Sequence, residues 1–361
     1  MKLAKRTGVI TFLHNENYGS TLQAWALQKT LARLGCDAEH IDYRPSQAEK
    51  VRNLLRSGNS PALILDGLRK RAVKAGQTGA RAKAASFDTF YAQHMRLSPV
   101  CRDRAALKKQ AAKYDLLLAG SDQVWSPVWL NPAYFLDFAA PGQPCAAYAP
   151  SLGVETMPAG RKARMMKRLL ARFGHISVRE TEGARIIAAL TGATPPVLPD
   201  PVMLATREEW LALAEPYGHD KPYLTCYFIG DRPDYWEAVR RIAAEKSLDV
   251  VVLPVTDNAY QQPYTLAAGL SPQAWLGCLA GAAHVVTDSF HGTAFSCLLG
   301  RDFTILRRYS EDDPESKNSR IDQLMRSLDI SGDDRDWAAI DARLAELRRE
   351  GTAYLQSVID A

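Results

Sequence analysis

The sequence His284-Val-Val-Thr-Asp-Ser-Phe-His-Gly-Thr-Ala-Phe-Ser-Cys-Leu-Leu-Gly300 holds the pattern on which the fold prediction rests. Its first part, Val285–Thr287, predicts a short buried strand. Its last part, Thr293–Leu299, predicts a helix that Gly300 ends. A strand followed directly by a helix is typical of an open α/β sheet, in which ligands bind outside the carboxyl ends of the strands.

Four polar or small residues, Asp288, Ser289, His291 and Gly292, fall at this predicted joint. A helix N-terminus presents N–H groups and partial positive charge, so phosphate or carboxylate is its natural ligand. His291 would meet such an anion as a hydrogen-bond donor or a proton carrier. The alternative interpretation is that His291 only caps the helix and packs under a loop.

The composition is that of an ordinary globular protein, with 47% hydrophobic and 24% charged residues. The 361 residues exceed one typical core, which predicts two domains. A formal net charge of +5 suits an anionic substrate or an acidic surface but requires neither.

The six cysteines are scattered without a C-x-x-C pair, and we expect small core residues in a reducing compartment rather than a disulfide framework or a metal site. No apolar run approaches the roughly eighteen residues that a membrane span needs. The basic N-terminus runs directly into a predicted strand, so the sequence predicts a cytoplasmic protein.

The chain opens with a predicted strand at Gly8–Leu13, a polar loop at His14–Ser20 and a helix at Thr21–Leu34, which together begin a parallel sheet. The loop supplies either a close backbone approach to a ligand or ordinary turn chemistry. Further strands are predicted at Ile41–Tyr43, Asp115–Ala119, Ala146–Ala149, Ile176–Val178, Tyr223–Ile229, Asp249–Val255 and Phe303–Leu306, and helices at Arg161–Phe173, Tyr235–Lys246, Ser271–Leu279 and Ile321–Leu328.

Four prolines within Thr194–Pro201 predict an extended crossing between two domains. The predicted division is residues 1–200, residues 201–330, and an amphipathic C-terminal helix within 331–361 that packs back on the first domain. Residues 45–113 form a basic helical insertion in the first domain. Its charge predicts either a solvated helical face or peripheral contact with an anionic membrane, and its lack of interleaved aromatics disfavours nucleic acid.

Two further places carry candidate functional groups. Gly120–Trp125 follows a predicted strand, and within it Asp122 is either a helix N-cap or a base. Arg179 follows the strand at Ile176–Val178 and offers a planar fork to an anion. The alternative for Arg179 is an ion pair with Glu180 or Glu182.

Taken together, several motifs of this chain resemble the polysaccharide pyruvyl transferase family. They are Tyr18-Gly-Ser-Thr-Leu-Gln-Ala24, Gly120-Ser-Asp-Gln-Val-Trp125, Ser177-Val-Arg-Glu180, Leu198-Pro-Asp-Pro201, Thr287-Asp-Ser-Phe-His-Gly-Thr293 and Asn318-Ser-Arg-Ile321. The resemblance extends from residue 8 to about residue 330. It implies an α/β architecture of GT-B type, with two Rossmann-like domains facing each other across a cleft.

The resemblance also implies transfer of a pyruvyl group from phosphoenolpyruvate to hydroxyls of a polysaccharide or its lipid-linked precursor, without a metal or redox cofactor. It implies donor binding by Arg179, Ser289, His291, Gly292 and Thr293, with His291 also serving as general acid. The acceptor sugar would contact Asn17, Tyr18, Asp122 and Gln123, with Asp122 as a base.

One departure concerns Ser289, where several family members have arginine. A second cation must then come from elsewhere, and Arg320 is the first candidate, followed by Arg307, Arg308 and Lys317. Two other functions stay open. One is a GT-B glycosyltransferase that uses a nucleotide-sugar, with Glu311, Asp312 or Asp313 on the ribose. The other is a non-catalytic saccharide-binding protein on the same fold.

Overall fold

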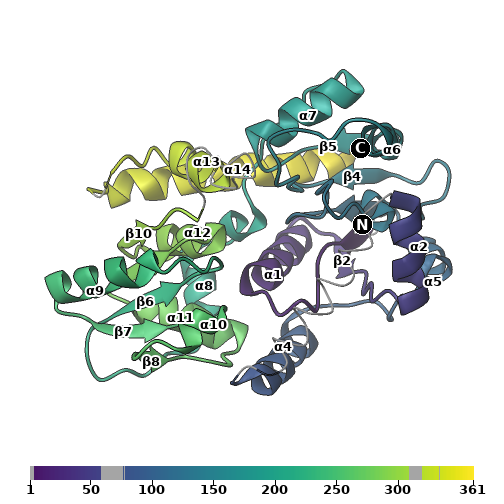
Figure 1. Cartoon of the computed structure of the whole chain (residues 1–361). Helices are drawn as coiled ribbons and strands as arrows, with labels where there is room; N and C mark the ends of the chain where they lie inside the picture. Colours follow the sequence, from purple (N-terminus) through teal and green to yellow (C-terminus); the bar gives the residue numbers. More distant parts are fainter. Residues whose placement is uncertain (1–3, 58–75, 77, 309–318, 333) are drawn as a thin grey trace. The chain divides into compact units, whose positions relative to one another are not determined.

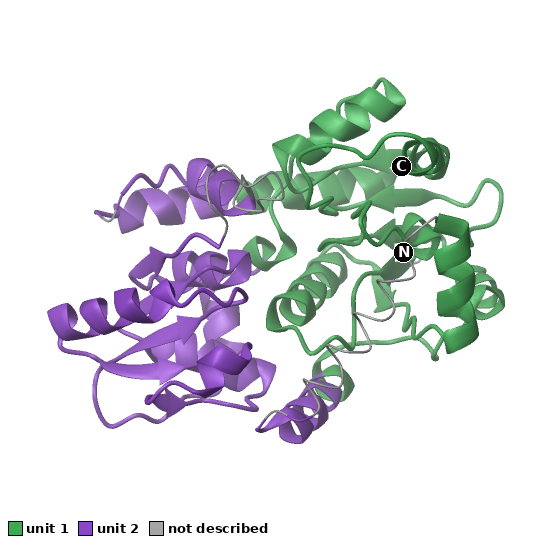
Figure 2. Cartoon of the chain, in the orientation of Figure 1, with its two compact units in different colours: residues 1–71, 91–204, 347–361 green, residues 72–90, 205–346 purple. Residues whose placement is uncertain are grey.

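The computed structural model describes residues 4–57, 76, 78–308, 319–332 and 334–361. The chain divides into two compact units (Figure 2). Unit 1 comprises residues 1–71, 91–204 and 347–361, and unit 2 comprises residues 72–90 and 205–346. Each unit contains a five-stranded parallel sheet with helices packed against it (Figure 1).

The sheet of unit 1 has the strand order β2-β1-β3-β4-β5. Its strands are β1 (Arg6–Ile10), β2 (Asp37–His40), β3 (Leu116–Ala119), β4 (Cys145–Ala147) and β5 (His175–Ile176). The chain moves from β1 to one side and then continues with β3 on the other side, so the order reverses between β1 and β3. The loops that follow these two strands therefore meet at a topological switch point, where open α/β sheets bind ligands.

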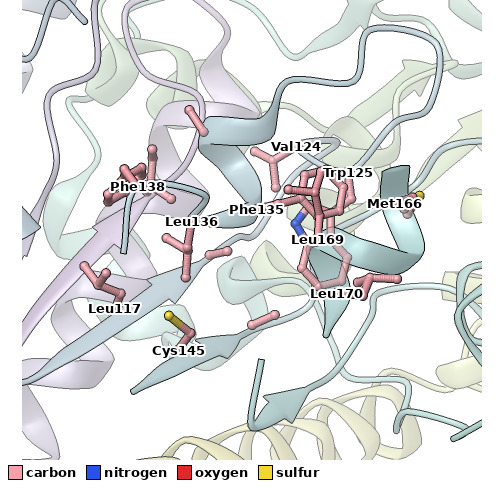
Figure 3. Close-up of a cluster of buried hydrophobic side chains, with 14 of the residues drawn as sticks. Leu117, Val124, Trp125, Phe135, Leu136, Phe138, Cys145, Met166, Leu169 and Leu170 are labelled. Atoms are coloured by element: carbon pink, nitrogen blue, oxygen red, sulfur yellow. The ribbon is translucent and has the colours of Figure 1, made fainter. Parts of the chain in front are cut away.

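Both faces of this sheet are covered, because successive side chains of a strand point to opposite faces. Val9, Leu116, Leu118 and Ala146 join one core, and Ile10, Leu117, Ala119 and Ala147 join the other. The second core is the larger and contains Trp125 stacked on Phe135 at 5.1 Å (Figure 3). Continuous apolar strands such as Leu116–Ala119 are what a doubly covered parallel sheet requires.

The helices of unit 1 are α1 (Tyr18–Arg33), α2 (Gln47–Ser57), α5 (Arg104–Ala111), α6 (Arg161–Leu170) and α7 (Thr181–Thr191), with 3₁₀ turns η1 (Pro132–Phe135) and η2 (Pro201–Leu204). Among the described residues, α4 (Ala80–His94) and α14 (Trp337–Asp360) each contain residues assigned to both units. The last turns of α14 place Leu355 and Val358 in the core of unit 1 beside Leu27 and Leu31 of α1.

The sheet of unit 2 has the strand order β10-β9-β6-β7-β8, and its order reverses between β6 and β9. Its strands are β6 (Tyr223–Tyr227), β7 (Asp249–Val252), β8 (Thr265–Leu266), β9 (His284–Thr287) and β10 (Phe303–Ile305). Its helices are α8 (Arg207–Leu213), α9 (Asp234–Lys246), α10 (Asp257–Tyr260), α11 (Pro272–Gly281), α12 (Phe290–Leu299) and α13 (Ser319–Ser327). The predicted joint after Thr287 lies at this second switch point.

Several element bounds and one unit boundary in the structure differ from the sequence predictions. The second strand is Asp37–His40, paired in register with Arg6–Val9, and Ile41–Tyr43 continues beyond it. The unit boundary falls at 204/205, because η2 still packs in unit 1 with the buried Leu204. The described insertion residues 76 and 78–90 group with unit 2.

The basic insertion is described only in part, because residues 58–75 and 77 lie outside the described residues. Within the described part of the chain, no helix has both the length and the apolar character needed to cross a membrane. All six cysteines of the sequence are buried free thiols, and burial is the largest influence that raises the pKa of the Cys145 thiol to about 11.

Candidate functional site

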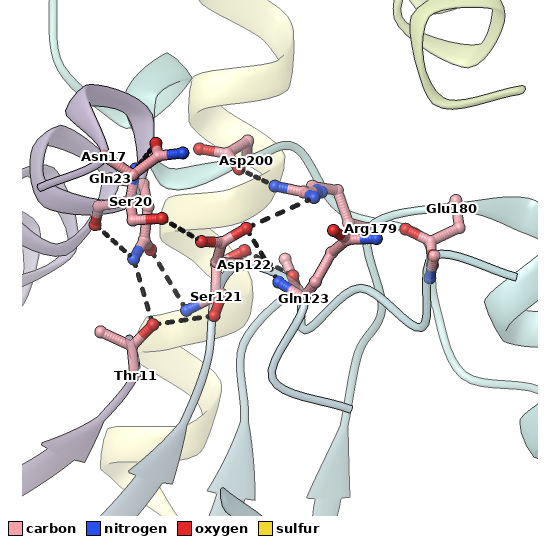
Figure 4. Close-up of polar contacts among 12 residues, drawn as sticks. Thr11, Asn17, Ser20, Gln23, Ser121, Asp122, Gln123, Arg179, Glu180 and Asp200 are labelled. Carbon is pink, nitrogen blue, oxygen red and sulfur yellow. Dashed lines mark hydrogen bonds and ion pairs between the residues drawn. The ribbon is translucent and has the colours of Figure 1, made fainter. Parts of the chain in front are cut away.

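The switch point of unit 1 carries a hydrogen-bonded cluster built on Asp122. Asn17 caps α1 by accepting a hydrogen bond from the Ser20 backbone N–H at 3.1 Å. The Ser20 hydroxyl donates to Asp122 Oδ2, and the backbone N–H of Gln123 donates to Asp122 Oδ1 at 2.8 Å (Figure 4). Asp122 itself has a left-handed backbone with a φ of 66°, which asparagine and aspartate tolerate better than most residues.

Arg179 lies deep in the same cluster, with only 3% of its side chain exposed. Its Nη1 donates to Asp200 Oδ2, and its Nη2 lies 3.9 Å from Asp122 Oδ1 (Figure 4). Burial alone would lower the pKa of Arg179, but the carboxylates of Asp200, Asp122 and Glu180 outweigh it and raise the pKa. The guanidinium is therefore held charged between two carboxylates.

Asp200, which pairs with Arg179, was not one of the two partners expected from the sequence. Glu180 instead accepts hydrogen bonds from the backbone N–H groups of Leu152 and Gly153, at 2.7 and 3.2 Å, and so fixes the loop after β4. Asp200 comes from the proline-rich stretch that the sequence identified only as a linker. Its two oxygens accept from Arg179 and from the backbone N–H of Val202, at 3.1 Å for the latter.

The predicted acceptor residues lie at one edge of unit 1 but differ in exposure. Asn17 is exposed, Gln123 is partly buried, and Tyr18 is buried with 4% of its surface exposed. The Gln123 amide packs against Gly153, where an added Cβ would lie 1.7 Å from its Nε2. Asp122 and Gln123 are thus brought together by the loop after β3, and Asn17 by the loop after β1.

The switch point of unit 2 has the predicted helix start. Ser289 is the N-cap of α12, and its hydroxyl accepts a hydrogen bond from the Gly292 N–H at 3.3 Å. Glycine is required at 292, because a Cβ there would lie 2.4 Å from Thr287 Oγ1. His291 stands in the first turn of α12, partly buried, with its ring 5.2 Å from that of Phe290.

Asp288 anchors this turn to the neighbouring loop. Its carboxylate accepts from the backbone N–H groups of Ile229 and Gly230, both at 2.7 Å, and from Tyr235 Oη at 3.2 Å. Burial, followed by the charge of Asp288, raises the pKa of the Tyr235 phenol far above its ordinary value. Gly230 has no room for a side chain, since a Cβ would lie 2.7 Å from Asp288 Oδ2.

Arg308 is the cation that the structure places at this turn. Its Nε donates to Asp288 Oδ2 at 3.0 Å and its Nη2 to the Asp288 carbonyl at 3.2 Å, with 22% of the side chain exposed. Of the other candidates, Arg307 pairs with Asp322 at 3.0 Å and Arg320 lies partly buried at the start of α13. Lys317, Glu311, Asp312 and Asp313 lie outside the described residues.

The sequence does not single out Arg308 ahead of Arg320, because spacing does not show which cation returns to the β9–α12 turn. Asp200 lies within the motif Leu198-Pro-Asp-Pro201, where the prolines indicate a linker and give no sign of a partner for Arg179. The described residues contain no group of three or more His, Cys, Asp or Glu side chains arranged to hold a metal ion.

A sequence model of the family described as polysaccharide pyruvyl transferase matches residues 17–309, which include both switch points. The chain belongs to the polysaccharide pyruvyl transferase family. No curated protein sequence is significantly similar to the chain. The family match covers Asn17 through Arg308, and so spans the clusters built on Asp122 and on Asp288.

Solved structures share the fold at low identity. A UDP-N-acetylglucosamine 2-epimerase superposes with a TM-score of 0.51 at 12% identity, covering 99% of this chain and 91% of that one. The UDP-GlcNAc 2-epimerase from Neisseria meningitidis, solved bound to UDP-GlcNAc, gives a TM-score of 0.50 at 9% identity, covering 98% and 94%. This chain therefore has the two-sheet α/β fold of GT-B proteins.

Proposed function

We propose that this protein transfers the pyruvyl group of phosphoenolpyruvate to hydroxyls of a saccharide, with the donor bound by unit 2 and the acceptor by unit 1. The observation that carries the proposal is the turn between β9 and α12. There a helix N-terminus, the imidazole of His291 and the guanidinium of Arg308 occupy one switch point.

Phosphoenolpyruvate carries a phosphate and a carboxylate, so its site needs several sources of positive charge. The N-terminus of α12 contributes backbone N–H groups and the helix dipole. Arg308 contributes a fixed charge whose position is set by Asp288. His291 contributes a donor that can also move a proton. We assign Arg308 as the second donor cation ahead of Arg320, because Arg308 contacts the residue next to Ser289.

The chemistry balances without a redox cofactor. His291, as general acid, gives a proton to the methylene carbon, and the C2 carbon accepts one saccharide hydroxyl oxygen. The C2–O bond to phosphate then breaks, and a second hydroxyl closes a cyclic ketal. The two hydroxyl protons replace the proton added to carbon and the one taken by the leaving phosphate.

The switch point of unit 1 suits the acceptor because it presents carboxylate, amide and hydroxyl groups. Asp122 is the base of this proposal, and Asn17 and Gln123 contribute amide groups beside it. Arg179 holds Asp122 in place from its ion pair with Asp200. Its predicted contact with the donor stays a prediction.

The test replaces His291 with asparagine and measures two quantities. Phosphate release is followed with phosphoenolpyruvate and a panel of p-nitrophenyl glycosides, and the binding of phosphoenolpyruvate by calorimetry. We expect phosphate release to fall about 10²- to 10⁴-fold, the range of a general acid. The control is His219→Asn, which removes a partly buried histidine of unit 2 that lies 3.3 Å from Asp249 at the amino end of β7.

Two outcomes would overturn the proposal. One is unchanged phosphate release by the His291→Asn protein. The other is stabilisation of the unaltered protein by UDP-N-acetylglucosamine in a thermal shift experiment, with none by phosphoenolpyruvate, which would indicate a nucleotide-sugar transferase. A protein that binds the glycosides but neither donor would be a saccharide-binding protein on this fold.

A further inference from the structure

His14 is a histidine of unit 1 that, like His291 in unit 2, lies at the carboxyl edge of its sheet. It follows β1, and Asp42 follows the neighbouring strand β2. His14 Nε2 lies 3.1 Å from Asp42 Oδ1, and the two side chains are 16% and 4% exposed. A partly exposed imidazole backed by a buried carboxylate is the arrangement of an oriented proton acceptor.

Asp42 is itself held in one position. Arg44 donates to both of its carboxylate oxygens, at 2.8 and 2.9 Å, and Ser98 Oγ accepts from the Asp42 backbone N–H at 3.0 Å. Burial acts to raise the pKa of Asp42, but the hydrogen bonds and charges of His14 and Arg44 outweigh it and lower the pKa. Asp42 is therefore a carboxylate that faces Nε2 at 3.1 Å and attracts a proton on that nitrogen, so the proton acceptor of the pair is Nδ1.

The backbone of His14 is in the left-handed region, with a φ of 56°. A residue other than glycine is held there at a cost of about 1 kcal/mol or more, and such positions concentrate at functional sites. Tyr91 supports the conformation, since its hydroxyl accepts from the His14 backbone N–H at 3.1 Å and its ring lies 4.5 Å from the imidazole.

The loop that carries His14 also reaches the Asp122 cluster. Asn15 Nδ2 donates to Ser20 Oγ at 3.2 Å, and Ser20 donates to Asp122. Both carboxylate oxygens of Asp122 already accept hydrogen bonds, and Arg179 lies beside one of them. A ketal requires two hydroxyls to lose their protons, so a second proton acceptor in addition to Asp122 suits the reaction.

We propose that His14 is a general base for a saccharide hydroxyl and that Asp42 is its positioning residue, an inference that rests on the proposed pyruvyl transfer. In this step the hydroxyl O–H bond breaks as its oxygen bonds to C2, and His14 Nδ1 receives the proton. Asp42 stabilises the resulting imidazolium, and the proton leaves with the phosphate.

The test replaces His14 with glycine, because glycine adopts a φ of 56° without strain and leaves a space for free imidazole. The assay uses phosphoenolpyruvate and the p-nitrophenyl glycoside that supports the fastest phosphate release by the unaltered protein. We expect kcat to fall about 10²- to 10⁴-fold and the Kd for phosphoenolpyruvate to stay within about 2-fold. Added imidazole should restore the rate by about 10-fold or more.

Asp42→Asn tests the positioning role. It should lower kcat by a smaller factor, leave the Kd for phosphoenolpyruvate unchanged and show no rescue by imidazole. The matched control is His219→Gly, because His219 also lies beside an aspartate, Asp249, but at the amino end of a strand. We expect full kcat from this control.

A full kcat in His14→Gly, or a loss that imidazole does not restore, would overturn the inference and leave a structural role for His14. The proposed function fails in a different way, through the unaltered protein. If that protein neither binds phosphoenolpyruvate nor releases phosphate with any glycoside of the panel, both proposals fall.

Discussion

The two switch points are built alike but use their aspartates differently. In each, an aspartate follows a parallel strand and lies beside an arginine, Asp122 with Arg179 and Asp288 with Arg308. The Asp288 side chain is 0% exposed and accepts from two backbone N–H groups, a tyrosine and an arginine. The Asp122 side chain is 12% exposed and sits on a left-handed backbone.

The difference shows which charge each unit offers to a ligand. In unit 2 the carboxylate is fully engaged in fixing the turn, so the positive charge that remains for a ligand comes from the helix terminus and Arg308. In unit 1 the cation is the buried partner, since Arg179 is 3% exposed. There the Asp122 carboxylate, 12% exposed, and the amides of Asn17 and Gln123 lie nearer the surface. The proposed division into an anion site in unit 2 and a hydroxyl site in unit 1 rests on this difference, and the predictions on Arg179, Arg308 and Ser289 test it.

The largest effect is expected from Arg179→Met. This change leaves the Asp200 side chain, 0% exposed, as a buried charge without its cation. Breaking a buried pair from one side costs about 3–5 kcal/mol. Chemical denaturation should show this loss in the unfolding transition of unit 1.

The double variant Arg179→Met/Asp200→Leu serves as the control, because removing both charges avoids the unpaired carboxylate. It should recover most of the lost stability. If the double variant is no more stable than the single one, the stability loss does not come from the unpaired Asp200 carboxylate. A normal Kd for phosphoenolpyruvate in the double variant would remove Arg179 from the donor site.

Arg308→Ala is expected to act on the donor instead. A hydrogen bond to a charged group contributes about 1.5–3 kcal/mol, so the Kd for phosphoenolpyruvate should rise about 10- to 100-fold by calorimetry. Arg307→Ala is the matched control, since Arg307 is the preceding residue and pairs with Asp322. Equal losses of phosphoenolpyruvate affinity in both variants would show a general effect of charge. An unchanged Kd in Arg308→Ala would make Arg320 the first candidate for the second donor cation.

The β9–α12 turn was predictable because its information is local. Val285–Thr287 reads as an apolar strand, Ser289 is a good N-cap and Gly300 ends the helix, and each of these follows from neighbouring residues. The same holds for β3 and for the strand–helix alternation that predicted two parallel sheets. The second strand was misplaced because three of the four residues in Asp37–His40 are polar, and only its pairing with β1 makes it a strand.

The partners of the site residues were not predictable, because they come from distant parts of the chain. Asp200 reaches Arg179 across 21 residues and Arg308 reaches Asp288 across 20. Neither pairing follows from spacing on a helix or a strand. The contact of His14 with Asp42 needs the order of β1 and β2 in the sheet, which the sequence alone left open.

Acid is expected to weaken unit 1 through His40. Its ring is 0% exposed, its Nε2–H donates to the Ala24 carbonyl at 2.9 Å, and burial lowers its pKa to about 4. A histidine in the unfolded chain has a pKa of about 6.5, so between pH 6.5 and pH 4 the unfolded state binds more protons, and stability decreases as the pH is lowered. At pH 5 the loss is about 2 kcal/mol.

Thermal unfolding at pH 7 and pH 5 measures this effect, which corresponds to about 4–8 °C for a domain of this size. His40→Gln keeps a donor for the Ala24 carbonyl and does not titrate, so the unfolding temperature of this variant should change much less between pH 7 and pH 5. An equal change in the variant would place the acid sensitivity elsewhere.

The smallest effect on stability is expected at Ser289, and it separates capping from donor binding. Ser289→Ala removes the acceptor for the Gly292 N–H and should cost about 1 kcal/mol. Ser289→Asp keeps a good cap and complements the helix dipole, so stability should be retained. It also places a negative charge where the donor's anion is proposed to bind, and the Kd for phosphoenolpyruvate should rise by about 10-fold or more. Undiminished binding in Ser289→Asp would mean that the anion lies away from the α12 terminus. The proposed donor site in unit 2 would then be wrong.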